Sequence, residues 1–276
     1  MTFDISNTTG NSNLISEDEG KIADILKENY LPKVNSTSKD VSKKDTLYTR
    51  VIKRIIDIII SLPVFCFLLP FNLVFGICTF FDVGRPIFYK QTRVGKDGKP
   101  FSMIKFRNMK NTVDDDGNLL PASQRVTKFG KFMRKYSLDE LLNFWNVIKG
   151  DMSIIGPRPL PIFFYERMSD RHTKRDFVRP GLECPRMIEG SEEELGYYQL
   201  QFENDIWYVE NVSLKTDLRM AFALIKMVFT MNERSKHASV GTYFVGYDEH
   251  GKALSMRMAL EEYPDILKES KGEISQ

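Results

Sequence analysis

An aspartate and a glutamate lie side by side, Asp139 and Glu140, in a stretch whose residue types suit chemistry on a phosphate group. Ser137 precedes them, and a Ser followed three residues later by Glu predicts a capping box at the start of a helix. A helix N-terminus carries a partial positive charge that favours the ionised form of a carboxyl group, so Asp139 is expected to be an anion. An ionised carboxylate is a competent nucleophile toward phosphorus.

Basic side chains near this acidic pair in the sequence suit a phosphate. Arginine binds phosphate oxygens through two parallel hydrogen bonds, and several of these arginines adjoin Gly or Pro in short loops. A diphosphate substrate with a divalent cation would complete the charge balance. Acidic residues are also common in first helical turns that do no chemistry, so the pair alone does not establish an enzyme. The candidate phosphate-binding residues are Lys105, Arg107, Arg134, Arg158 and Arg179.

The helix that would carry the acidic pair is predicted from a periodic apolar pattern. Apolar side chains recur three and four residues apart, which predicts one buried face. Gly150 stands where a C-terminal cap is expected. The residues of this predicted buried face are Leu138, Leu141, Leu142, Trp145 and Ile148.

Shorter elements are predicted on both sides of this helix. Residues 86–91 and 101–106 have the composition of short strands, and a Gly-rich turn at 95–98 joins them. The polar stretch 114–118 lacks the closing Glu of a calcium loop and is predicted to be a turn. Residues 213–231 are apolar but interrupted by charges, which indicates a helix on a membrane surface or packed on the domain.

A long apolar run precedes these elements. The 24 residues from Ile58 to Phe81 contain no charge, and a bilayer-spanning helix needs about 20 apolar residues. Pro63 and Pro70 lie inside the run, and proline bends or breaks a helix. Both flanks are basic, and basic residues prefer the cytoplasmic side, so a bent helix that enters and leaves through one face satisfies both ends. A plain single span and a buried core helix remain alternatives. The flanking cations are Arg50, Lys53, Arg54, Arg85, Lys90, Arg93 and Lys96.

Composition excludes several other classes of protein. The 276 residues carry a net charge of only +2, which gives no general basic field for nucleic acid. Cys66, Cys78 and Cys184 are too few and too scattered for a disulfide framework or a zinc site, and the chemistry is expected to face the cytosol. The three histidines, residues 172, 237 and 250, form no metal-ligand pair and are expected to be structural. We expect no signal peptide, because the first apolar run begins late.

Residues 137–159, SLDELLNFWNVIKGDMSIIGPRP, are very similar to the signature of the bacterial sugar transferases, the monotopic phosphoglycosyl transferases that act on undecaprenyl phosphate. Further stretches resemble other parts of that family, and together they cover roughly residues 48–232. These stretches are 53–57, 86–95, 105–109 and 205–211. The resemblance implies an α+β fold, a small mixed domain of helices and short strands. A bent re-entrant helix at about 51–81 and amphipathic helices would dock it on the membrane.

The resemblance also implies a reaction. In the family, the Asp of the pair attacks the sugar-linked phosphate of a UDP-sugar, UMP leaves, and polyprenyl phosphate then takes the phosphosugar. By position, Asp139 would be the nucleophile and a ligand of the required Mg²⁺, and Glu140 would assist. The cations Lys105, Arg134, Arg158 and Arg179 match family positions near the phosphates. The reaction initiates the assembly of exopolysaccharide, capsule, O-antigen or glycoprotein glycans.

The implied partners are a UDP-sugar, polyprenyl phosphate and the lipid bilayer, with no nucleic acid; a homodimer stays open. The implied location is the bacterial inner membrane, with the active domain on its cytoplasmic face. Residues 1–47 and 233–276 would be polar extensions. In the first, Ser16 and the apolar residues 22, 25 and 26 predict a helix.

Two departures from the family pattern stand out. The family breaks its membrane helix at Ser-Pro, whereas this chain has Leu69 and Pro70, with Pro63 as an additional proline. The loop at 182–190 shares with the family pattern only its place after Arg-Pro-Gly and the residue Gly190. Recognition of the nucleotide or the sugar is therefore expected to differ. The sugar cannot be predicted. The altered loop favours an alternative in which the protein is an inactive membrane scaffold for polysaccharide assembly, and the intact acidic pair opposes it. A different membrane phosphohydrolase is a more distant alternative.

Overall fold

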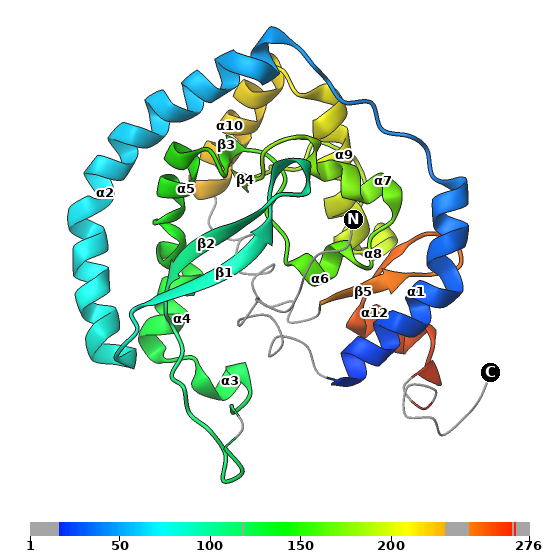
Figure 1. The fold of residues 1–276 in the computed structure, drawn as a ribbon, viewed down its shortest axis with the longest axis horizontal. Helices are drawn as coiled ribbons and strands as arrows, with labels where there is room; N and C mark the ends of the chain where they lie inside the picture. Colours follow the sequence, from blue (N-terminus) through cyan, green and yellow to red (C-terminus); the bar gives the residue numbers. More distant parts are fainter. Residues whose placement is uncertain (1–16, 118, 230–242, 267, 269–276) are drawn as a thin grey trace.

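The computed structural model describes residues 17–117, 119–229, 243–266 and 268. His237 and Ser16 lie outside them, as do parts of the predicted extensions, the last residue of the 114–118 turn and the end of the 213–231 helix. Figure 1 shows a mixed domain of helices and short strands with one long helix curving along its side. The fold class therefore agrees with the α+β prediction.

The chain forms helices, short helical turns and three two-stranded sheets, with β1–β2 and β5–β6 antiparallel and β3–β4 parallel. The α-helices are α1 (Glu17–Thr37), α2 (Lys53–Val83), α3 (Ala122–Arg125), α4 (Lys128–Lys135), α5 (Asn143–Lys149), α6 (Ile162–Tyr165), α7 (Asp170–Thr173), α8 (Glu192–Leu195), α9 (Tyr197–Asn211), α10 (Leu214–Phe229) and α12 (Met256–Glu262). The other helical turns are η1 (Tyr48–Ile52), η2 (Lys96–Gly98), η3 (Leu138–Glu140) and η4 (Lys174–Phe177). The strands are β1 (Phe88–Val94), β2 (Pro100–Phe106), β3 (Ser153–Ile155), β4 (Gly181–Glu183), β5 (Phe244–Tyr247) and β6 (Ala253–Ser255).

The predicted hairpin is confirmed. β1 pairs with β2 in a continuous antiparallel register from Phe88 opposite Phe106 to Val94 opposite Pro100. At the tip, the Gly95 amide donates to the Lys99 carbonyl at 2.8 Å, and a side chain at Gly95 would collide with that oxygen. The turn at 114–117 is also confirmed, with the Gly117 amide donating to the Asp114 carbonyl.

The long helix α2 has its polar and apolar faces inverted relative to a helix of a soluble protein. Asp57, Ser61, Asn72 and Thr79 are buried against the domain. The outward face is apolar, whereas a water-soluble domain turns such a face to its core. Its exposed side chains include Ile55, Ile59, Ile60, Leu62, Phe67, Leu69, Phe71, Leu73, Val74, Ile77, Phe80 and Phe81. With η1, the helix runs over 36 residues from Tyr48 to Val83, long and apolar enough to cross a bilayer.

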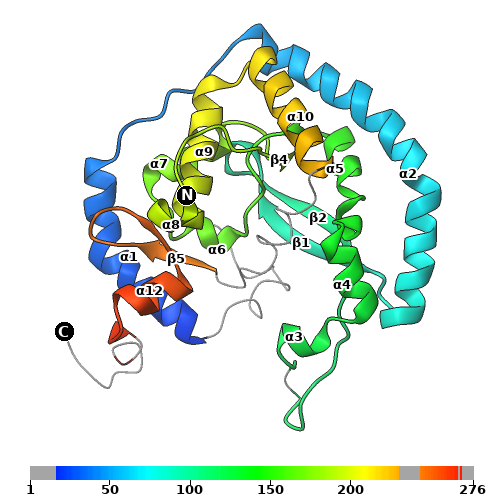
Figure 2. The same ribbon diagram turned by 180° about the vertical axis from the view of Figure 1, so that it is seen from behind.

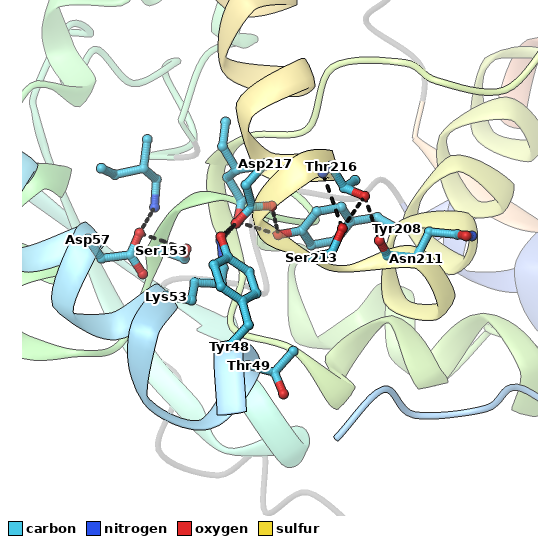
Figure 3. A network of polar contacts seen from close by, with 12 residues as sticks. Tyr48, Thr49, Lys53, Asp57, Ser153, Tyr208, Asn211, Ser213, Thr216 and Asp217 are labelled. Carbon is cyan, nitrogen blue, oxygen red and sulfur yellow. Dashed lines mark hydrogen bonds and ion pairs between the residues drawn. The ribbon is translucent and has the colours of Figure 1, made fainter. Parts of the chain in front are cut away.

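Helix α2 runs through Pro63 and Pro70 without interruption, and Figures 1 and 2 show it curving around the domain. Its first turns are fixed by polar contacts (Figure 3). The Lys53 ammonium lies 2.6 Å from Asp217 on α10, and the Tyr48 hydroxyl donates to the same carboxylate at 2.5 Å. Asp57 accepts hydrogen bonds from the Ser153 hydroxyl and the Ile154 amide at 3.0 Å.

The last turn of α2 is bonded to the same domain. Asp82 accepts a hydrogen bond from the Thr127 hydroxyl at the start of α4, over 2.5 Å. The Arg107 guanidinium donates to the Val83 carbonyl. Both ends of an apolar helix that could cross a bilayer are therefore attached to one domain.

The segments before and after this domain pack on each other. The predicted N-terminal helix is confirmed as α1, and its Ile22 and Leu26 are buried against β5, β6 and α12. Aromatic rings of β5, α6 and α9 then join this unit to the rest of the protein, with Phe244 and Phe202 centred 5.0 Å apart. Residues 17–37 are therefore a packed element of the fold, as are the described residues of the C-terminal segment.

Candidate active site

Asp139 and Glu140 lie on the single turn η3, between α4 and α5. The predicted capping box is wrong. Ser137 has φ 54° and ψ 28°, in the left-handed region, and makes no side-chain cap. A capping side chain requires the extended backbone that Ser137 does not have. The helix α5 begins only at Asn143, so the acidic pair precedes it and does not lie in its first turn.

The predicted buried face of α5 is also wrong. Trp145 is 45% exposed, and its ring lies tilted beside that of Phe65 of α2, with centroids 5.7 Å apart. The buried side chains are Asn143, Asn146 and Val147. The apolar periodicity marked the side that faces α2 and the exterior, and the domain interior receives two amides and Val147 instead. The predicted C-terminal cap is confirmed, since Gly150 adopts φ 99°.

Glu140 is held between two of the predicted cations. The Lys105 ammonium of β2 lies 2.6 Å from its carboxylate, and the Arg158 guanidinium lies 3.1 Å from the same oxygen. Burial alone would raise the pKa of Glu140, but Arg158 and Lys105 outweigh it and lower the pKa to about 2. Glu140 is therefore an anion that fixes two cations beside Asp139.

Asp139 is 7% exposed, and the side-chain amide of Asn108 links it to a third cation, Arg134. The Asn108 side-chain nitrogen donates to its carboxylate at 3.0 Å, and the Asn108 oxygen accepts from the predicted cation Arg134 at 2.9 Å. Burial, together with the charge of Glu140, raises the pKa of Asp139 above its ordinary value. The helix terminus that was expected to favour its ionised form begins only at Asn143, four residues later. The nearby cations Lys105 and Arg134 oppose this rise.

The close approach of α4 to Asn108 depends on Gly130. A side chain at this position would overlap the Asn108 carbonyl oxygen. Thr127 caps α4 by accepting a hydrogen bond from the Gly130 amide, so the helix begins where its backbone can meet the end of β2. Arg134 is thereby brought to Asn108.

The loop that carries Arg158 follows β3 and is fixed by its neighbours. The backbone just after β3 and the start of β4 approach each other closely at Gly156 and Gly181. A side chain at Gly156 would lie 2.6 Å from the Arg179 carbonyl oxygen. Arg175 donates to the Arg158 carbonyl at 2.8 Å and forms an ion pair with Asp205 at 2.5 Å. Burial raises the pKa of Asp205 to about 6, against the opposing charge of Arg175.

Two of the five predicted phosphate-binding residues do not join this group. Arg107 turns to the end of α2, as described above. Arg179 donates to the Gly150 carbonyl at 2.9 Å, at the opposite end of α5 from the acidic pair. Arg54 binds the neighbouring Val147 and Ile148 carbonyls. Cations at a helix C-terminus bind its free carbonyls, and Arg179 does so at the end of α5.

Sequence reasoning missed other residues of the site. Asn108 lay in a stretch that resembles the family but had no assigned role. Arg93 was noted only as a flanking charge, yet it is partly buried and donates to the Pro159 carbonyl at 3.3 Å beside Arg158. Burial lowers the pKa of Arg93 to about 10. Arg93 lies two residues after Gln91 on β1. Side chains two residues apart on a strand point to the same face, so this spacing could have placed Arg93 beside Gln91.

The acidic pair fits a magnesium ion by its chemistry. Mg²⁺ prefers oxygen ligands and is commonly held by one or two carboxylates together with substrate phosphates and water. Asp139 and Glu140 supply adjacent carboxylates beside a group of phosphate-compatible cations. Within the described ranges, no group of three or more His, Cys, Asp or Glu side chains could hold a metal ion alone. The arrangement therefore fits an ion shared with a phosphate ligand.

Among the residues that the structure describes, no cysteine or histidine forms a hydrogen bond or an ion pair with the acidic pair. Cys66, Cys78 and Cys184 are free thiols, and the first two are exposed on α2. His172 is buried, 2.8 Å from the Tyr247 hydroxyl and 3.0 Å from Glu203, where it joins α7 to β5 and α9. His250 is exposed beside Glu249.

Comparison with known proteins agrees with this description. The family of bacterial sugar transferases matches residues 48–231. A protein of Bacillus subtilis named uncharacterized sugar transferase EpsL is 36% identical over 178 residues, which are 64% of this chain and 87% of that protein.

Relatives with named activities match the same region. A UDP-N-acetylgalactosamine-undecaprenyl-phosphate N-acetylgalactosaminephosphotransferase of Aeromonas hydrophila is 34% identical over 188 residues, 65% of this chain and 44% of that protein. A UDP-glucose:undecaprenyl-phosphate glucose-1-phosphate transferase of Klebsiella pneumoniae is 34% identical over 184 residues, 63% of this chain and 39% of that protein. The chain thus spans less than half the length of these two relatives. Because the family match covers most of the chain and includes the acidic pair, this protein belongs to the bacterial sugar transferase family.

Proposed function

We propose that this protein transfers a sugar 1-phosphate from a UDP-sugar to undecaprenyl phosphate at the inner surface of a bacterial membrane. The observation that carries the proposal is the arrangement around η3. Asp139 and Glu140 lie together, Lys105 and Arg158 contact Glu140, and Arg134 reaches Asp139 through Asn108. The names of the relatives from Aeromonas hydrophila and Klebsiella pneumoniae support a reaction between a UDP-sugar and undecaprenyl phosphate.

Asp139 is the nucleophile of the proposed reaction. One carboxylate oxygen forms a bond to the sugar-linked phosphorus, and the bond from that phosphorus to the UMP oxygen breaks. UMP leaves with the electron pair, and no proton is required. An oxygen of undecaprenyl phosphate then attacks the same phosphorus, and the bond to Asp139 breaks. The two steps together conserve the phosphate ester and return Asp139 to its starting form.

Glu140 holds the cations that receive the phosphates. Because its pKa is lowered to about 2, it stays ionised at neutral pH and keeps Lys105 and Arg158 in place. These cations and Arg134 would stabilise the negative charge of the diphosphate as its bonds change. Arg93 and Arg175 fix the carbonyl oxygens of Pro159 and Arg158 and so orient the loop.

Magnesium belongs to the proposal. Asp139 would be a ligand, with Glu140 beside it and oxygens of the diphosphate completing the site. The ion would neutralise phosphate charge and hold the diphosphate for an in-line displacement.

The membrane arrangement is proposed from α2. Both of its ends are bonded to one domain while its outward face is apolar. A helix that crossed the bilayer would carry its two ends to opposite surfaces, so we propose that α2 enters and leaves one leaflet, facing the cytoplasm. The exposed stripe of α10, Leu214, Leu218, Phe222 and Ile225, and Phe132 of α4 would lie at the same interface.

The sugar stays open because the loop at 182–190 departs from the family pattern. In this chain Asn204 of α9 fixes the loop, accepting from the Met187 amide at 2.7 Å. The loop therefore has its own defined structure beside β4. We expect the product to start the assembly of a polysaccharide or a glycan such as exopolysaccharide, capsule or O-antigen. The inactive scaffold remains the competing proposal, and the ion pairs of Glu140 with Lys105 and Arg158 oppose it.

Release of UMP tests the proposal. Membranes that contain the protein are incubated with Mg²⁺, undecaprenyl phosphate and, in turn, UDP-glucose, UDP-galactose and UDP-N-acetylgalactosamine. We expect UMP release with at least one UDP-sugar and none above background from Asp139→Asn. Equal release from both proteins would contradict the role of Asp139. No release with any of a broader panel of UDP-sugars would favour the scaffold.

A further inference from the structure

Asn143, the first residue of α5, is fully buried and its side-chain amide has no partner. Its relative exposure is 0%, and neither the amide nitrogen nor the amide oxygen forms a hydrogen bond with any described residue. Most buried amides in folded proteins are paired, because losing hydrogen bonds to water without replacement destabilises the fold. An unpaired buried amide beside a reactive group is therefore a candidate for a functional role.

Asn143 follows Asp139 by four residues, across the turn that joins η3 to α5. Leu141 has φ −57° and ψ −26°, and Leu142 has φ −67° and ψ −15°, so the chain is helical from η3 into α5. About one turn of helical backbone therefore separates the two side chains. Both side chains are buried, whereas Glu140 and Phe144 are only partly buried.

The next buried amide of α5 behaves differently. Asn146 donates to the Ser102 carbonyl at 2.9 Å and to the Asp151 carboxylate at 3.0 Å, joining α5 to β2 and to the loop after α5. Its amide nitrogen has an evident structural function. Asn143, between Asp139 and Asn146 in the sequence, has no such contacts, so packing of α5 does not explain an amide there.

We propose that the Asn143 amide binds the Asp139 carboxyl group when Asp139 carries the phosphosugar. This proposal rests on the proposed function. In the covalent step one oxygen of Asp139 becomes bonded to phosphorus, and the other becomes a carbonyl oxygen of an acyl phosphate. The carboxyl group of Asp139 then carries no charge of its own, so the cations that surround the free carboxylate attract it less. The Asn143 nitrogen, one helical turn away, donates to that carbonyl oxygen and stabilises the intermediate.

The test replaces the amide with an apolar side chain of similar size, Asn143→Leu. Three quantities are measured: the rate of UMP release in the first turnover without undecaprenyl phosphate, the KM for the UDP-sugar, and the melting temperature of the purified protein. The donor is whichever of UDP-glucose, UDP-galactose and UDP-N-acetylgalactosamine gives the fastest release with the unchanged protein.

We expect Asn143→Leu to slow first-turnover UMP release by about ten- to a hundredfold, the factor that one hydrogen bond to a charged or reacting group supplies. The KM should be unchanged, and the melting temperature should be equal or higher, because an unpaired polar group is removed from the interior. Asn146→Leu is the matched control and should lower the melting temperature, since it breaks two existing hydrogen bonds.

Two results would overturn the inference. Unchanged first-turnover release would mean that Asn143 takes no part in the covalent step. A lower melting temperature together with slower release would mean that the amide is structural, with a bound water as its partner. In both cases the unchanged protein still releases UMP, so the proposed function stands. If the unchanged protein releases none with any UDP-sugar, the proposed function itself fails and this inference with it.

Discussion

The side-chain amide of Asn108 donates a hydrogen bond to the carboxylate of Asp139 over 3.0 Å. Both residues are buried, and they come from separate elements, the chain just after β2 and the turn η3. The Asn108 oxygen accepts from Arg134, so the amide also sets the distance between that cation and the carboxylate. An uncharged residue thereby orients the proposed nucleophile.

Replacing Asn108 by leucine should reduce the rate of UMP release strongly. The substitution removes the hydrogen bond to Asp139 and the acceptor that holds Arg134. A hydrogen bond to a charged group contributes about 1.5–3 kcal/mol, which corresponds to a loss of about ten- to a hundredfold in kcat/KM. UMP release by Asn108→Leu is compared with that by Asn211→Ala, which removes an amide bonded only to the Trp207 carbonyl of its own helix among the described contacts. A loss as large in the control would point to a general effect on folding.

The pH dependence of the reaction should move when Lys105 is neutralised. The proposed nucleophile, Asp139, must be ionised, so activity should fall as the pH drops through its pKa. Burial and Glu140 raise that pKa, and the charge of Lys105 lowers it. Lys105→Gln removes this lowering effect, so the pKa of Asp139 rises and the acidic limb of kcat/KM moves to higher pH.

Arg179→Gln is the control for this shift. Arg179 was a predicted phosphate-binding residue of the same charge type, but it binds the Gly150 carbonyl at the far end of α5. Its removal should leave the acidic limb where it is. If both substitutions move the limb equally, the effect would come from total charge and not from the position of Lys105.

The ion pair between Arg175 and Asp205 should matter for stability. Both side chains are 2% exposed, and Arg175 also holds the Arg158 carbonyl. Asp205→Ala leaves a buried guanidinium without its counter-charge, which costs about 3–5 kcal/mol. Thermal unfolding should show a clearly lower midpoint, and UMP release at low temperature should fall as well, because the Arg158 loop loses a support. Glu261→Ala, which breaks the exposed pair with Arg257, should change neither quantity.

Local patterns predicted much of the fold. Strand-like composition and turn residues predicted the hairpin β1–β2, and helical periodicity predicted α1. An apolar stretch interrupted by charges predicted α10. These signals depend on neighbours in the sequence. The same reasoning failed at η3. Its capping pattern was present, but the left-handed conformation of Ser137 results from the junction of α4 with the following turn, which no short pattern encodes.

The site could be predicted only in part for a similar reason. The acidic pair and three of five cations were brought together, whereas Arg107 and Arg179 were not. Nearness in sequence cannot separate an arginine at a phosphate site from one that binds the end of a helix. The apolar face of α5 was assigned to the domain interior because periodicity does not show what an apolar face packs against, and in the structure Trp145 lies beside Phe65 of α2.

Native cysteines offer a test of the proposed membrane arrangement. Cys66 and Cys78 are exposed on the outward face of α2, so the proposal places them in lipid. In intact membranes they should not react with a water-soluble maleimide, and they should react once the protein is unfolded in detergent.

In a variant without native cysteines, Asp45→Cys and Arg85→Cys place thiols at the two ends of the helix, on exposed residues. Both should be labelled by an impermeant maleimide only when the reagent reaches the cytoplasmic side, because both helix ends are bonded to one domain. Labelling of the two positions from opposite sides would mean that the helix crosses the bilayer. Ready labelling of Cys66 and Cys78 in intact membranes would mean that the apolar face of α2 is covered by something other than lipid.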